Sequence, residues 1–132
     1  MSRWEEMQFE DKIRSILRET QYVVRPDHHM APPFLTAYQI AIEFAHRFPD
    51  EFQRTGLRIG GQGLGEHNSL AQYIARELSR RIQSPNPEIR DIQGGFLSNK
   101  HLLGISFDND GTRIDSSLTD SQFDLSMFRL KR

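Results

Sequence analysis

Residues 36–48, TAYQIAIEFAHRF, specify one amphipathic helix and thereby indicate the fold class of this chain. Thr36 and Gln39 have the spacing of a capping box, in which each side chain accepts a hydrogen bond from a backbone N–H that the helix start leaves free. One face of the helix then carries the apolar residues Ala37, Ile40, Ala41, Phe44, Ala45 and Phe48. Pro49 disfavours helical geometry at the residue before it, so we expect the helix to end at Phe48.

Two further helices are predicted, one on each side of residues 36–48. Ser2 and Glu5 again have the capping-box spacing. They precede an apolar stripe made of Phe9, Ile13, Ile16 and Leu17. This pattern predicts a helix over residues 3–19. Ser69, with Asn68 as an alternative cap, opens another helix over residues 69–83. Its stripe consists of Leu70, Tyr73, Ile74, Leu78 and Ile82.

After Pro87 the hydrophobic period changes from helical spacing to alternation, which predicts strands. The alternating residues are Leu103, Ile105 and Phe107 in one run, and Phe123, Leu125 and Met127 in another. Asp108–Gly111 is a strong turn signal next to the first run. We therefore expect an antiparallel meander over residues 89–130. Helices followed by strands indicate an α+β fold, with three N-terminal helices packed on one face of a C-terminal antiparallel sheet of three to four strands.

Length and composition limit the classes of protein to which the chain can belong. Its 132 residues suit a single domain over residues 1–132. It has no cysteine, which excludes a disulfide framework, a thiolate zinc site and a cysteine nucleophile. A formal net charge of −1 gives no overall attraction to nucleic acid or anionic lipid. With no apolar run long enough for a membrane span and an acidic rather than basic N-terminus, we expect a cytoplasmic protein without a membrane partner.

The glycine-rich stretch 60–65 is the first candidate for a functional site, because such a loop before a helix can bind a ligand through its backbone N–H groups. The ligand-binding residues it predicts are Gly61, Gly63, Gly65 and Asn68. A phosphate-binding P-loop would continue with Lys and Ser or Thr, whereas this chain has Glu66 and His67. The loop therefore predicts a ligand site but no nucleotide cofactor.

Glu66 and His67 are themselves candidate catalytic residues, because a carboxylate beside an imidazole can act as an acid/base pair. They carry the alternative that the chain is a small hydrolase-type enzyme. The histidines predict no metal site, since the adjacent His28 and His29 cannot both face one ion in regular structure. We predict neither a metal nor a cofactor.

Arg76, Arg80 and Arg81 lie close together on the predicted helix 69–83 and could contact the phosphates of DNA. In element order alone, residues 36–118 resemble the winged helix-turn-helix class, in which one helix enters the major groove beside a hairpin. The resemblance implies a DNA-binding domain that uses these arginines. The chain departs from that class in the long connection between residues 48 and 69 and in its acidic hairpin. The alternative is a solvated arginine face with Glu77 as its partner.

Met127 and Phe128 are adjacent in the last predicted strand, so both of its faces carry an apolar side chain. Such a strand is either buried on both sides or meets a second chain. From this we expect a small interaction module that forms a homo-oligomer, with its ligand site at the glycine-rich loop. Nucleic-acid binding and catalysis are the alternatives.

Overall fold

The computed structural model describes residues 2–20, 32–60, 69–116 and 125–131. The helices in these ranges are α1 (Arg3–Glu6), α2 (Phe9–Arg18), α3 (Ala37–Arg47), α4 (Pro49–Thr55) and α5 (Leu70–Gln83). The strands are β1 (Leu35–Thr36), β2 (Ile92–Leu97), β3 (Ser106–Asn109), β4 (Thr112–Asp115) and β5 (Leu125–Leu130). Helices precede most of the strands and all strand pairs are antiparallel, so the fold is α+β, as the sequence predicted.

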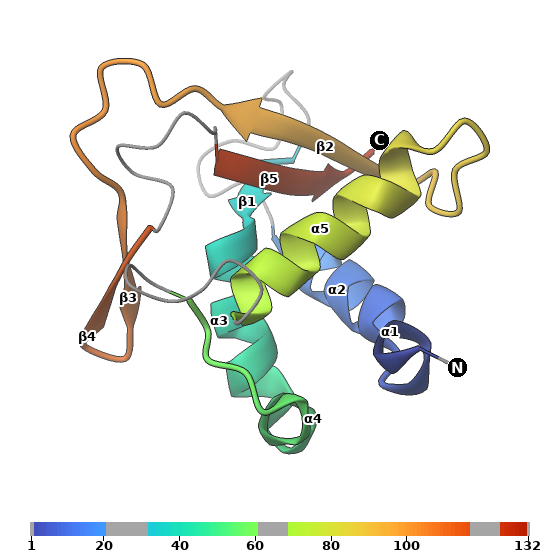
Figure 1. Ribbon diagram of the computed structural model, residues 1–132, viewed down its shortest axis with the longest axis horizontal. Coiled ribbons are helices and arrows are strands. Elements are labelled where there is room, and N and C mark those ends of the chain that lie inside the picture. Colours follow the sequence, from blue (N-terminus) through green and yellow to red (C-terminus); the bar gives the residue numbers. More distant parts are fainter. Residues whose placement is uncertain (1, 21–31, 61–68, 117–124, 132) are drawn as a thin grey trace.

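Three strands form one antiparallel sheet in the order β1-β5-β2, with the last strand of the chain in the middle. Leu35 of β1 lies opposite Phe128, and on the other side of β5 Gly94 of β2 lies opposite the same residue. Helices α2, α3 and α5 lie on one side of this sheet (Figure 1). The arrangement leaves β2 at one edge.

The β3–β4 hairpin forms a separate two-stranded sheet, which corrects the expectation of one continuous meander. It packs against α3: the ring of Phe107 stacks on that of Tyr38 with centroids 5.1 Å apart, and Asn109 Oδ1 lies 2.8 Å from His46 Nε2. The predicted turn at residues 108–111 is confirmed, because Asp108 Oδ1 accepts a hydrogen bond from the Gly111 N–H at 2.8 Å. The alternation at Leu103, Ile105 and Phe107 indicated a strand where β3 lies, but it did not predict that β3 pairs with β4.

The caps predicted at Thr36 and Ser69 are confirmed. Thr36 Oγ1 accepts from Gln39 N at 3.2 Å, and Gln39 Oε1 accepts from Thr36 N at 2.7 Å, which completes the capping box of α3. Ser69 Oγ accepts from Gln72 N at 3.1 Å at the start of α5. The stripe on α3 faces the core as predicted, and Phe44 is fully buried within it.

The predicted first helix is divided at Met7 and Gln8, since Gln8 takes a left-handed backbone conformation with φ 55°. The break folds Trp4 back onto Phe9, with stacked rings 5.3 Å apart. Phe9 in turn stacks on Phe44 at 4.7 Å. Burial of these aromatic surfaces compensates for the interrupted helix. Nothing in the local sequence signals the break.

Candidate interaction surface

Residues 61–68, which include all of the glycine-rich stretch except Gly60, lie outside the described residues. This applies to the predicted ligand residues Gly61, Gly63, Gly65 and Asn68 and to the catalytic candidates Glu66 and His67. Their roles stay predictions. Around them, the structure describes Gly60, where an added Cβ would come within 2.6 Å of the Tyr38 ring, and Ser69 at the cap of α5. Position 60 therefore accepts only glycine without movement of its neighbours.

The three arginines of α5 do not form one free cationic face. Arg81 is only 5% exposed: its Nη1 donates to Glu77 Oε2 at 2.6 Å, and its guanidinium carbon lies 4.7 Å from the centre of the Trp4 ring. Arg80 is exposed and donates to the same Glu77 oxygen at 2.7 Å. Arg76 is exposed and lies over the Tyr73 ring. The sequence correctly indicated Glu77 as the partner of these arginines but missed that the Arg81 side chain is buried.

The charge of Glu77 is held by these neighbours. Burial alone would raise the pKa of its carboxyl, but the hydrogen bonds from Arg80 and Arg81 outweigh burial and leave the pKa lowered. Glu77 is therefore ionised and neutralises part of the arginine charge. A phosphate at this face would compete with a built-in carboxylate, which weakens the case for DNA contacts through Arg81.

Strand β2 offers a different kind of surface, because among the described residues it pairs only with β5. Lys131 N donates to Asp91 O at 2.9 Å, which continues the β2–β5 ladder by one residue. Backbone groups of an antiparallel strand alternate in direction. The backbone N–H and C=O groups therefore point toward β5 at residues 91, 93, 95 and 97. They point toward the free edge of β2 at Ile92, Gly94 and Phe96.

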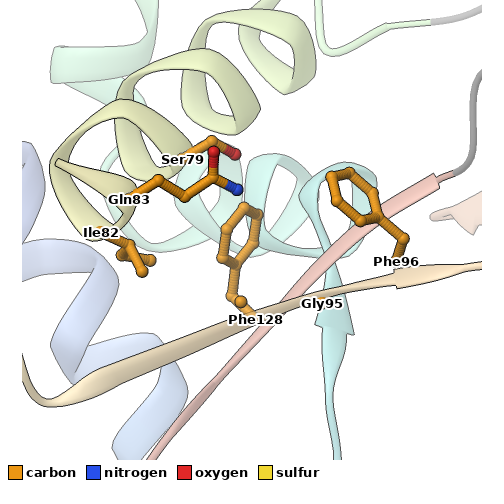
Figure 2. Close-up of a pocket in the computed structure, with 7 residues that line it drawn as sticks. Ser79, Ile82, Gln83, Gly95, Phe96 and Phe128 are labelled. Atoms are coloured by element: carbon orange, nitrogen blue, oxygen red, sulfur yellow. The ribbon is translucent and has the colours of Figure 1, made fainter. Parts of the chain in front are cut away.

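The two faces of β2 differ. A Cβ on Gly94 would meet Phe128 at 3.4 Å and Ile82 at 3.8 Å, so this residue faces the helices. A Cβ on Gly95 would meet Phe34 at 3.8 Å, on the opposite face of the sheet. By alternation Phe96 shares the helix side with Gly94. In Figure 2 its side chain rises from the sheet in the same direction as that of Phe128.

The missing side chain at Gly94 leaves a hollow between α5 and the sheet, which we call the Gly94 hollow. Its volume is about 170 Å³, and the exposed Phe96 of β2 is among the residues that line it (Figure 2). It is lined by Ser79, Ile82, Gln83, Gly94, Gly95, Phe96 and Phe128. Its walls are mostly apolar, with two polar side chains from α5.

Beside the Gly94 hollow, Phe96 is 59% exposed and Leu97 39% exposed. The six residues of β2 include no charged side chain and no proline. Sheet edges in soluble proteins are usually protected by lysine, proline or a bulge, because an unprotected edge pairs with other strands. β2 contains neither lysine nor proline at any of its six positions.

Of the two readings of the last strand, burial on both sides or contact with a second chain, the position of β5 in the middle of the sheet supports burial. Met127 and Phe128 do have apolar environments on both faces, but β5 lies in the middle of the sheet. Phe128 is buried against the helices, and Met127 is half-buried on the side where Gly95 and Phe34 meet. The signal for β2 was present in the uncharged run Gly94–Leu97, which places apolar residues on both faces of a strand.

Within the described ranges, no group of three or more His, Asp or Glu side chains is placed to hold a metal ion. In the same ranges, no helix combines the length and apolar character needed to cross a membrane. Comparison with family models, with curated proteins and with solved structures finds no match to this chain.

Proposed function

We propose that this chain is a small interaction module that self-associates through the free edge of β2. The observation that carries the proposal is the combination, on one strand, of edge backbone groups that pair with no described strand and the exposed side chain of Phe96. Backbone groups at a sheet edge accept another strand by continuing the ladder, and exposed apolar side chains gain free energy when the added strand covers them.

Self-association is favoured over an unrelated partner by symmetry. Most soluble homo-oligomers are two-fold dimers, in which the same patch meets itself. A single antiparallel edge suits such a dimer, because a two-fold axis perpendicular to the sheet brings two copies of β2 side by side in opposite directions. The two sheets then become one six-stranded sheet with the helices of both copies on the same side.

The experiment that tests the proposal is the solution mass by light scattering over a range of protein concentrations. We expect dimers that dissociate on dilution. Phe96→Lys places a charge at the edge and should give a monomer at every concentration. Leu103→Lys is the matched control, because Leu103 is 95% exposed but lies outside β2, and it should leave the mass unchanged. Circular dichroism verifies that both variants fold.

A wild-type chain that is monomeric at all concentrations would overturn the proposal. The same samples measured with a short DNA duplex at low salt test the nucleic-acid alternative. A complex that weakens steeply as salt rises, and that depends on Arg76 and Arg80, would support that alternative instead.

A further inference from the structure

We infer that the Gly94 hollow of each copy receives Phe96 of the other, so that the dimer has a fixed register with its two-fold axis at Gly95. This inference rests on the proposed function, because it specifies how the two β2 edges meet. The inference adds the specific contact, Phe96 in the Gly94 hollow, that selects a second copy of this chain as the partner.

The faces of β2 restrict the register. In a sheet continued across a perpendicular two-fold axis, residues directly opposite each other must point to the same face. Phe96 and Gly94 both point to the helix side and are two residues apart. When Gly95 lies opposite Gly95 of the second copy, each Phe96 lies opposite a Gly94. No register shifted by two residues in either direction gives this match, because Phe96 then faces Ile92 or another Phe96.

The backbone agrees with this register. Gly94 and Phe96 are residues whose N–H and C=O groups point to the free edge, as the Lys131–Asp91 hydrogen bond of the ladder indicates. Placed opposite each other, Gly94 of one copy and Phe96 of the other form a hydrogen-bonded pair, which exchanges both of its N–H···O bonds. The pairing occurs twice, once on each side of the axis.

The side chains agree as well. A phenyl ring opposite an edge glycine covers the exposed backbone and the space beside it, which is a known means of stabilising glycine in a sheet. Here that space is the Gly94 hollow, with the apolar walls Ile82 and Phe128. Phe96, which is 59% exposed in the single chain, would exchange water for these walls. An unrelated strand would need an aromatic residue opposite Gly94. A second copy of this chain supplies Phe96 at that position on both sides of the two-fold axis.

The register is tested with single cysteines, which the natural chain lacks. Gly95→Cys places two thiols directly opposite each other at the axis, where Cα atoms in an antiparallel sheet lie about 4.5–5.5 Å apart. A disulfide requires about 4.4–6.8 Å. Under mild oxidation we expect a covalent dimer. The control Gln93→Cys faces the same side of the sheet. In this register its two cysteines lie four residues apart along the strands, about 13 Å, so they should not form a disulfide.

The contact itself is tested with two adjacent alanine substitutions. Gly94→Ala puts a methyl group into the hollow, only 3.4 Å from Phe128, and should raise the dimer Kd about tenfold or more. Gly95→Ala makes the same backbone change on the other face, at an ordinary 3.8 Å contact, and should change the Kd far less. Thermal unfolding at a concentration where both are monomeric separates any loss of fold from loss of association.

The outcomes distinguish the two proposals. A monomeric wild type ends the proposed function and this inference together. A dimer that is lost in Phe96→Lys, but in which Gly95→Cys stays reduced, keeps the β2 edge and rejects the register. Equal effects of Gly94→Ala and Gly95→Ala would show that the hollow does not receive Phe96.

Discussion

Arg81→Ala should destabilise the fold strongly, although sequence alone makes this residue a candidate for a surface contact. The guanidinium is 5% exposed, is paired with Glu77 and lies over the Trp4 ring. Its removal leaves the Glu77 carboxylate, which is 15% exposed, with Arg80 as its remaining partner on α5. Breaking a buried ion pair from one side costs about 3–5 kcal/mol, and the remaining partner reduces that figure. The lost stacking on Trp4 adds about 0.5–2 kcal/mol.

We therefore expect Arg81→Ala to lower the free energy of unfolding by about 2–4 kcal/mol, measured by urea denaturation followed by circular dichroism. For a chain of this length the melting temperature should fall by on the order of 10 °C. Arg80→Ala is the matched control, because it removes an exposed partner of the same carboxylate, and it should have a much smaller effect.

Arg81→Met separates the two contributions, since methionine keeps most of the apolar contact with Trp4 but not the charge. Arg81→Met should recover part of the stability lost in Arg81→Ala. The double variant Arg81→Met with Glu77→Gln should recover more, because it leaves no buried carboxylate without its partner. Unfolding of Arg81→Ala at the same urea concentration as the wild type would contradict a stabilising role for the buried Arg81 side chain. Loss of DNA affinity with unchanged stability would assign Arg81 to phosphate contact instead.

Three further outcomes follow from the core, a cap and an ion pair. Phe44→Ala should cost about 3–5 kcal/mol in urea denaturation, because the ring is fully buried, and a loss of a few tenths would contradict its place in the core. Thr36→Ala should cost about 1 kcal/mol, since it removes the cap of α3, while Thr36→Ser should keep most of it. Asp91 receives hydrogen bonds from Arg14 that lower its pKa below the unfolded value, so its stabilising effect is present at neutral pH and lost on acidification. The stability difference between wild type and Asp91→Asn should shrink between about pH 5 and pH 3, and a constant difference over that range would argue against the pair.

The sequence determined those features that depend on near neighbours in the chain. The capping box at Thr36, the cap at Ser69, the turn at residues 108–111 and the buried faces of α3 and α5 all follow from residues within a few positions of one another. Helical and alternating periods are local as well, so the α+β class could be predicted. Even the Glu77–Arg81 pair is local, because residues four apart adjoin on a helix.

Tertiary structure alone decided which strand lies at the edge of the sheet. Alternation shows that a segment is a strand, but the order β1-β5-β2 depends on contacts between residues about ninety positions apart, such as Leu35 and Phe128. That order covers the last strand on both sides and leaves β2 with one edge that no other described strand covers. The same holds for Arg81, whose burial depends on Trp4 from the other end of the chain. A residue belongs to a candidate surface only if no distant part of the chain covers it. Local sequence patterns carry no information about such distant contacts.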